Sequence, residues 1–192
     1  MFERFRAAFP PAGGGAIQPF DRTPLAGCPG FAELAAECGG TVFGDGLVRV
    51  HSEGSARRVN PLIAEAFPDF PEQFQAIAQD WTGRQFAVGS RPGARYYGKL
   101  LLFEPASGEA FEIDADISAL FNSEMISDPV TYLAADLFED WRRAGGSLGG
   151  PNECVGFRVP LFLGGDGVVE NLEVVDLEVY WSLFGQLRSG GG

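Results

Sequence analysis

Hydrophobic positions recur at helical spacing near both ends of the chain and alternate with polar positions between them. In residues 31–38 (FAELAAEC), the side chains of Phe31, Leu34 and Cys38 fall on one face. A proline precedes this segment and two glycines follow it, which is the usual asymmetry of a short helix. Residues 47–51 then alternate apolar and polar side chains, and this pattern predicts a strand.

The middle of the chain consists of short apolar runs between turn residues. Asn60-Pro61 predicts a second helix over residues 62–67, because asparagine caps helices and proline suits their first position. Glycine, proline and serine then interrupt the sequence repeatedly, as they do in turns between antiparallel strands. The runs between these turns predict strands at residues 74–78, 85–88, 99–103 and 110–113.

Helical spacing returns from Asp116 onward, where Ile117, Leu120 and Phe121 share a face. The strongest helical pattern covers residues 129–144, which begin with proline directly after an aspartate that can cap the helix. We expect its apolar face to bury four large side chains, those of Leu133, Leu137, Phe138 and Trp141.

The last part of the chain begins with an extended apolar segment, residues 154–167 (CVGFRVPLFLGGDG), that ends in a tight turn. Asp176 predicts the cap of a terminal helix over residues 177–188, although the interior Gly185 disfavours a helix. The whole pattern predicts an α+β fold with a mostly antiparallel central sheet, from Leu47 to Ile113, and flanking helices.

A chain of 192 residues forms one domain or two small, tightly packed lobes. We expect one integrated domain with an extended lead-in, rich in Pro and Gly, that Ile17, Phe20 and Leu25 anchor to the surface. The predicted parts are the lead-in at 1–27, an α+β lobe at 28–115, a helical C-terminal lobe at 116–188 packed on it, and a flexible tail at 189–192.

Charge and hydropathy exclude two classes of partner. Asp and Glu total 26 against 14 Lys and Arg, a net charge of -12, and such a field repels the phosphates of nucleic acids. The apolar runs are far shorter than the roughly 20 residues that span a bilayer. The first residues lack a secretory signal, and three cysteines without a CxxC pair indicate a reduced, cytoplasmic protein with buried thiols; one disulfide with a spare thiol is the alternative.

Motifs for catalysis, cofactors or metals are not found. His51 is the only histidine, it has no recognisable nucleophile motif beside it, and one histidine with three scattered cysteines predicts no metal site. The glycine-rich turns lack the lysine of a phosphate loop. Carboxylates spaced by four residues are typical of solvated helix faces, and nothing in the sequence shows that pairs such as Glu112/Asp114 or Asp166/Glu170 converge. The sequence therefore predicts no enzyme, no cofactor and no metal.

Several segments resemble a known family. The run FAELAAECGGTVFGDGLVRV resembles the early part of SUKH and Smi/Knr-like domains, and DWTGRQFAV and LLLFEPASGEAFEI resemble the strands that follow it. LAADLFEDW and CVGFRVPLFLGGDGVVENLEVVDLEVYWSLFGQL are similar to the C-terminal domain of immunity proteins against type VI secretion DNase effectors, in which a GAD-like domain comes first. The resemblance covers about residues 28–188, and its most specific piece is residues 159–165 with Asn171.

This resemblance implies a SUKH-like fold and a cytoplasmic immunity protein that neutralises a toxin, most simply a basic type VI nuclease, by occluding it. The oligomeric state stays open. The acidic charge suits such a partner, because a nuclease presents a cationic cleft to DNA. Two alternatives stay open: a regulatory or scaffolding protein of the same fold without a toxin partner, and a small hydrolase. The candidate partner-binding residues are four carboxylates crowded near the C-terminus: Asp166, Glu170, Glu173 and Glu178.

Overall fold

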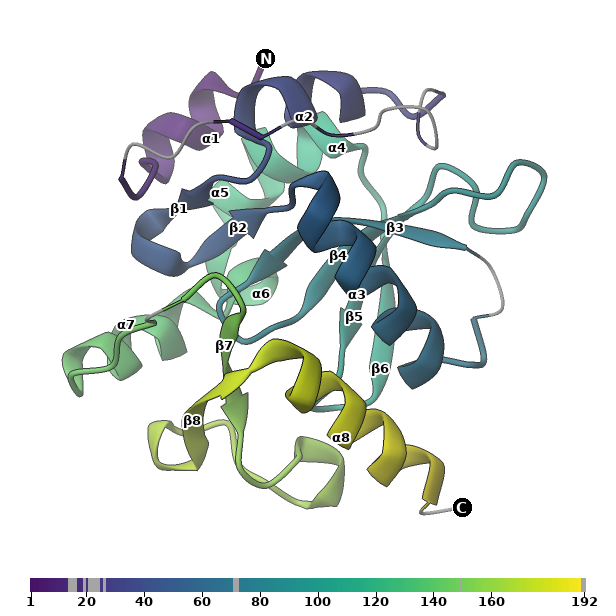
Figure 1. Cartoon of the computed structure of the whole chain (residues 1–192). Coiled ribbons are helices and arrows are strands. Elements are labelled where there is room, and N and C mark those ends of the chain that lie inside the picture. The colour runs from purple at the N-terminus through teal and green to yellow at the C-terminus, as the bar shows by residue number, and fades with distance from the viewer. Residues whose placement is uncertain are drawn as a thin grey trace.

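A six-stranded antiparallel sheet forms the centre of the computed structural model, which describes residues 1–13, 17–18, 20, 25, 27–70, 73–148 and 150–190 (Figure 1). The strands follow each other in the sheet in chain order, and each strand pairs antiparallel with the next. This confirms the predicted α+β class and the predicted meander. The strands are β1 (Val42–Phe43), β2 (Val48–Val50), β3 (Phe74–Asp80), β4 (Gln85–Gly89), β5 (Leu100–Glu104) and β6 (Glu109–Ile113).

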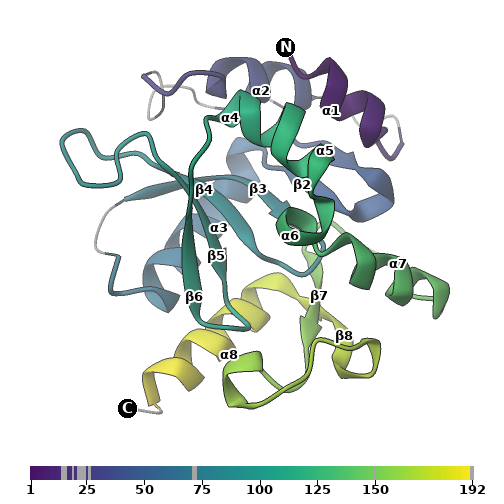
Figure 2. The ribbon, with the colours of Figure 1, turned by 180° about the vertical axis from the view of Figure 1, so that it is seen from behind.

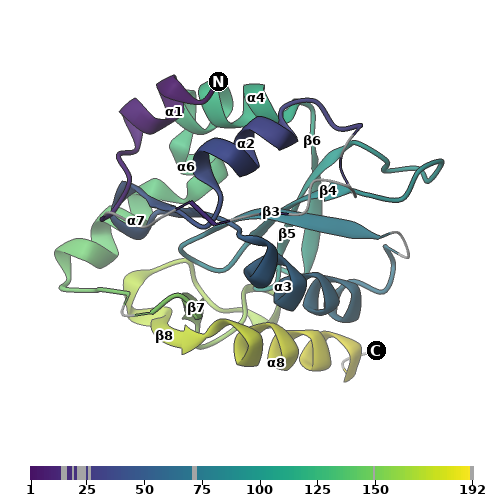
Figure 3. The same ribbon diagram turned by 45° about the horizontal axis from the view of Figure 1, so that its top comes forward.

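Helices cover both sides of this sheet. Figure 3 shows α1 (Glu3–Ala8), α2 (Phe31–Cys38) and α4 (Ile117–Ala119) on one side, and α3 (Glu53–Ala66) with α8 (Leu177–Gly190) on the other. Helix α3 packs against β3, and α8 packs against α3. The predicted helix at residues 31–38 is confirmed, with its apolar face buried.

Helix α3 begins earlier than predicted. The helix predicted over residues 62–67 is the last part of α3, but its predicted start was wrong because Ser52, not Asn60, is the cap. The Ser52 hydroxyl accepts from the Ser55 amide, and the Ser55 side chain accepts from the Ser52 amide. Asn60 instead accepts a hydrogen bond from the amide of Ala76 at 2.9 Å, so it fixes the helix to β3. Pro61 consequently lies inside the helix.

The amino-terminal residues contribute to the core, and the expectation of an extended lead-in was wrong for residues 3–8, which form α1. Phe2 and Phe5 are fully buried, and the Phe5 ring lies 4.9 Å from that of Phe43 in β1. Of the three predicted anchors, Leu25 is buried and Phe20 packs against Phe31, whereas Ile17 is half exposed. Residues 14–16, 19, 21–24 and 26 of the expected lead-in lie outside the described residues.

The predicted continuous helix at 129–144 is in fact two helices, α6 (Pro129–Leu133) and α7 (Ala135–Arg143), separated by Ala134 with φ of 50°. The break has a tertiary cause. The Trp81 indole donates to the carbonyl of Leu133 at 2.9 Å, and Arg84 donates to the carbonyl of Tyr132 at 3.0 Å, so side chains of the β3–β4 turn bind the acceptors at the end of α6.

This break changes which side chains reach the core. Leu133, Phe138 and Trp141 are buried as predicted, but Leu137 is only partly buried because α7 starts a new direction after Ala134. Before α6, a wide π-type turn (Leu120–Glu124) joins α4 to α5 (Met125–Ser127). Seen from behind in Figure 2, this chain of short helices runs down the back of the molecule to α7.

The C-terminal region was expected to be a helical lobe, but it also contains a small sheet. Strands β7 (Glu153–Phe157) and β8 (Leu172–Asp176) pair antiparallel as a separate two-stranded sheet, joined by short 3₁₀ turns at Leu161–Leu163 and Val169–Asn171. The small sheet joins the large one where the Val155 amide donates to the carbonyl of Trp81 at 2.8 Å.

Helix α8 is capped as predicted, since the Asp176 carboxylate accepts from the amides of Glu178 and Val179. Its interior Gly185 has a structural reason: a Cβ there would come within 3.2 Å of the Ala66 Cα on α3. The helix continues to Gly190, so residues 189 and 190 belong to α8 and not to the expected flexible tail, and residues 191–192 of that tail lie outside the described residues.

The three cysteines are free and buried, as predicted. Among the residues that the structure describes, no helix is long and apolar enough to cross a membrane.

Candidate functional site

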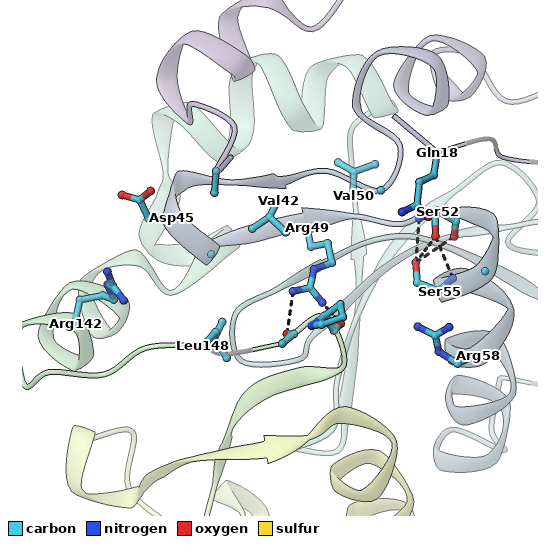
Figure 4. Close-up of a pocket in the computed structure, with 16 residues that line it drawn as sticks. Gln18, Val42, Asp45, Arg49, Val50, Ser52, Ser55, Arg58, Arg142 and Leu148 are labelled. Carbon is cyan, nitrogen blue, oxygen red and sulfur yellow. Dashed lines mark hydrogen bonds between the residues drawn. The ribbon is translucent and has the colours of Figure 1, made fainter. Parts of the chain in front are cut away.

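A pocket of about 820 Å³ lies beside β1 and β2, under the start of α3 and next to the loop that follows α7 (Figure 4). Three arginines from three elements line it: Arg49 from β2, Arg58 from α3 and Arg142 from α7. In Figure 4, Arg142 lies at one end of the pocket, Arg49 near its middle and Arg58 at the other end. Asp45 is the only carboxylate among the described lining residues.

Arg49 is the most enclosed of the three arginines. Its two terminal nitrogens donate to the carbonyls of Pro151 and Gly150, the latter at 3.4 Å. Its Nε is buried and has no hydrogen-bond partner among the described residues. Burial lowers the pKa of Arg49, yet a guanidinium stays protonated at neutral pH. The pocket therefore holds a positive charge whose hydrogen-bond partners are neutral carbonyls.

The other two arginines bind the same connecting segment. Arg58 donates to the side-chain oxygen of Asn152 at 3.1 Å, and its Nε lies 3.5 Å from Glu178. Arg142 donates to the carbonyl of Gly146 at 2.9 Å. All three guanidinium groups thus hold parts of the connection between α7 and β7, mainly through neutral oxygens.

Behind the pocket wall, His51 is completely buried between Ser55 and Gln85. The Gln85 amide nitrogen donates to the Gly83 carbonyl, so its oxygen faces His51 Nε2 at 2.9 Å and that nitrogen carries the proton. Nδ1 is then the acceptor for the Ser55 hydroxyl at 3.0 Å. Burial lowers the pKa of His51 to about 4.

This arrangement does not favour the hydrolase alternative. A serine nucleophile needs a base that takes up a proton near neutral pH and a carboxylate that stabilises the resulting imidazolium. His51 stays neutral there and is oriented by an amide, and Ser55 is occupied by the capping of α3. The chain of hydrogen bonds instead fixes the start of α3 against β4.

The four predicted partner-binding carboxylates are all exposed, but they do not form one cluster. Asp166 and Glu170 line the same shallow depression between β7 and β8, next to Arg158. Glu173 on β8 lies 3.5 Å from Arg158, and Glu178 at the start of α8 lies 3.5 Å from Arg58. The structure thus brings Asp166 and Glu170 together and turns Glu178 toward the arginine pocket.

An apolar surface that was not predicted from the sequence lies next to these carboxylates. Val179, Leu183 and Leu187 follow each other at four-residue spacing on α8 and are 64%, 49% and 40% exposed. Seven of the twelve large hydrophobic side chains exposed in the described residues belong to this region. They are Val159, Leu163, Val168, Val174, Val179, Leu183 and Leu187. The four-residue spacing of these side chains on α8 could have been detected in the sequence. A helix needs only one apolar stripe to pack its inner face, so a second stripe indicates an exposed apolar surface.

Comparisons with known proteins locate a family in the same region. Residues 118–188 match the family described as T6SS immunity protein Tdi1, C-terminal. This part of the chain is therefore similar to a type VI secretion immunity protein, and the match does not extend to the residues before 118. The segment includes α7, the small sheet and most of α8, and with them all four predicted carboxylates and the exposed apolar side chains.

The whole fold also occurs in a solved structure. The chain is similar to the crystal structure of Atu4351 from Agrobacterium tumefaciens, with a TM-score of 0.64 and 15% sequence identity. The similarity covers 97% of this chain and 89% of that chain, and at this identity it shows the fold alone. No curated protein matched the chain.

Proposed function

We propose that this chain is an immunity protein that acts in the cytoplasm and neutralises a type VI secretion toxin, a nuclease, by covering its active site. The observation that supports the proposal is that the family match and the exposed apolar side chains occupy the same part of the chain. The immunity-family segment, residues 118–188, contains most of the large apolar side chains that the described surface exposes.

The composition of this region suits a protein interface. We define the C-terminal face as the exposed apolar side chains of residues 159–187 together with Asp166, Glu170, Glu173 and Glu178. Stable interfaces have an apolar centre surrounded by polar residues, and a few large side chains contribute most of the affinity. Leu183 and Val179 are the expected centre, because their side chains are large, exposed and adjacent on a well-ordered helix.

The carboxylates give the face the charge that a nuclease partner requires. Asp166 and Glu170 form no ion pair with the residues that the structure describes, so their charges remain available for a partner. A nuclease cleft is cationic, and an opposite charge on its inhibitor raises the association rate by long-range attraction. Such attraction weakens with salt, because the Debye length falls to about 8 Å at physiological ionic strength.

The test is binding of the purified chain to a toxin encoded beside its gene. Leu183→Asp places a charge at the centre of the C-terminal face, and we expect it to weaken binding by at least about a hundredfold, as for loss of a strong anchor. Val130→Asp is the matched control, since Val130 is 51% exposed but lies on α6. Equal weakening by both variants, or by neither, would place the interface elsewhere.

Charge-reversal variants test separately whether the carboxylates attract the toxin electrostatically. We expect Asp166→Lys and Glu170→Lys to slow association with the toxin, and more strongly at low salt than at high salt. Unchanged rates at low ionic strength would remove these carboxylates from the interface, and full protection of toxin-exposed cells by a Leu183→Asp variant would remove Leu183 from it. Failure of the unmodified protein to protect such cells would contradict the proposed function itself.

A further inference from the structure

We propose that the arginine pocket binds a small aliphatic anion that carries carboxylate or phosphate groups, held by Arg49, Arg58 and Arg142. This site borders the C-terminal face where Arg58 Nε lies 3.5 Å from Glu178, but the inference does not depend on the toxin. The family match and the fold similarity assign no ligand to it.

The local charge of the pocket is opposite to that of the chain. Carboxylates outnumber lysines and arginines by 26 to 14 overall, but three arginines and one aspartate are the charged residues among those described as lining the pocket. Surface charges that serve solubility alone would follow the overall excess of acid. A concentration of guanidinium groups around one hollow is the arrangement that captures anions, because each offers a planar pair of donors that matches a carboxylate or phosphate.

One hydrogen-bond donor of the Arg49 guanidinium is not used by the described residues. Both terminal nitrogens bind neutral carbonyls, and the buried Nε binds nothing among the described residues. A buried cation gains most from an anionic partner, since charge-assisted hydrogen bonds are about twice as strong as neutral ones. An oxyanion in the pocket would give Arg49 an anionic hydrogen-bond partner, in addition to the electrostatic attraction of the Glu153 carboxylate.

The start of α3 adds a second, fixed source of positive potential. Ser52, Gly54 and Ser55 of its first turn line the pocket, and the N-terminus of a helix attracts anions. This turn is held in place by the capping hydrogen bonds and by the buried His51–Gln85 contact behind it. The site is therefore organised before any ligand arrives, which reduces the entropy cost of binding.

The lining also limits the kind of ligand. It contains no aromatic ring among the described residues, so nothing there stacks on a nucleobase. Its apolar part consists of aliphatic side chains, among them Val42, Val50 and Leu148. The pocket consequently suits a compact anion with a short aliphatic body better than a nucleotide.

Calorimetric titration with inorganic phosphate and, separately, with citrate tests the proposal. We expect one binding site, and the tighter of the two probes identifies the preferred anion as a phosphate or a polycarboxylate. Arg58→Gln and Arg142→Gln change exposed side chains, and each is expected to weaken binding by about tenfold, the loss of one charge-assisted contact.

Two neighbouring arginines serve as matched controls. Arg57→Gln and Arg143→Gln remove the same charge next to Arg58 and Arg142, but these side chains do not line the pocket. Both controls are expected to bind the tighter probe like the unmodified protein. Binding that weakens equally in controls and pocket variants would show general charge attraction, and that result, or the absence of saturable binding of both probes, would overturn the proposal.

Discussion

The arginine pocket and the C-terminal face differ in charge, in burial and in the way their side chains are held. The pocket is cationic, and behind its wall lies a fully buried histidine with two side-chain partners. The C-terminal face is acidic and apolar, and its four carboxylates are exposed, with Glu173 paired to Arg158 and Glu178 paired to Arg58. The net charge of -12 therefore describes only one of the two regions, and a function inferred from total charge alone overlooks the other.

The two regions also differ in the contacts that hold them in shape. Elements of the large sheet, α3 and α7 meet at the pocket, so its geometry depends on long-range packing. The loop beneath the C-terminal face is shaped mainly by one side chain: Asn171 donates to the carbonyls of Val159 and Asp166 at 3.0 Å and accepts from the Val159 amide at 2.9 Å. We expect changes near the pocket to affect global stability and changes in the face to stay local.

The largest expected effect is at Trp81, which holds α7 and therefore Arg142 in the pocket wall. Its ring lies 5.2 Å from Phe138 and 5.4 Å from Trp141, and it is 1% exposed. Trp81→Ala is expected to lower the free energy of unfolding by about 3–5 kcal/mol, measured in urea. Trp81→Phe keeps an aromatic ring but loses the bond to Leu133, so a smaller loss is expected. A loss below about 1 kcal/mol for the alanine variant would contradict this dependence on long-range packing.

The next effect is a pH dependence of the free energy of unfolding, caused by His51 behind the pocket wall. Burial lowers the pKa of His51 to about 4, whereas an unfolded histidine titrates near its ordinary value of 6.5. Between these values the unfolded chain binds the additional proton, so stability is full above pH 6.5 and falls on acidification, by up to about 1.4 kcal/mol per pH unit. His51 is the only histidine, so His51→Gln is expected to flatten urea-unfolding stability between about pH 6.5 and 5. An unchanged slope in the variant would assign the dependence to carboxylates.

A smaller and more local effect is expected at Asn171, which shapes the loop of the C-terminal face. Asn171→Ala removes three hydrogen bonds, and we expect a loss of about 1–3 kcal/mol with faster hydrogen exchange at the Val159 amide. Asn171→Asp is the control, because it keeps an acceptor for that amide but loses both donors. Protection of the Val159 amide that drops equally in both variants would mean that the donors, rather than the acceptor, hold it.

The smallest effect is expected for the carboxylates of the face. Glu170→Gln and Asp166→Asn change exposed side chains without ion pairs to the described residues, so the unfolding free energy is expected to stay within about 0.5 kcal/mol. A clear stabilisation by either variant would show that the crowded charges repel each other in the free protein, which would sharpen the case for a cationic partner. Thermal and urea unfolding of the two variants would measure it.

Much of the fold was predictable because it depends on local patterns. Alternating apolar runs between turn residues predicted the strands of the meander, and proline–glycine punctuation predicted α2. Asp176 was correctly predicted as the cap of α8. These features rest on the spacing of neighbouring residues, which a sequence displays directly.

The errors have a common origin in contacts between distant residues. Asn60 resembled a cap because its amide suits that role, but it binds β3 instead, and α3 starts at Ser52. The helix at residues 129–144 is broken because Trp81 and Arg84 bind its carbonyls. Gly185 argued against a helix by propensity, but the close approach of α3 requires it.

The features of the two candidate sites also divide into those visible in the sequence and those that depend on contacts between distant residues. The sequence by itself determined the acidic charge, the carboxylates near the C-terminus and the family segment at residues 118–188, since each is a property of composition or of local order along the chain. Only the tertiary structure decided that Arg49, Arg58 and Arg142 share a pocket, because they lie on three separate elements that packing brings together. The same holds for His51, whose neutral state results from burial beside a glutamine 34 residues away. Charge can be counted along a chain, but its solvation and its partners depend on which residues the folded core places next to each other.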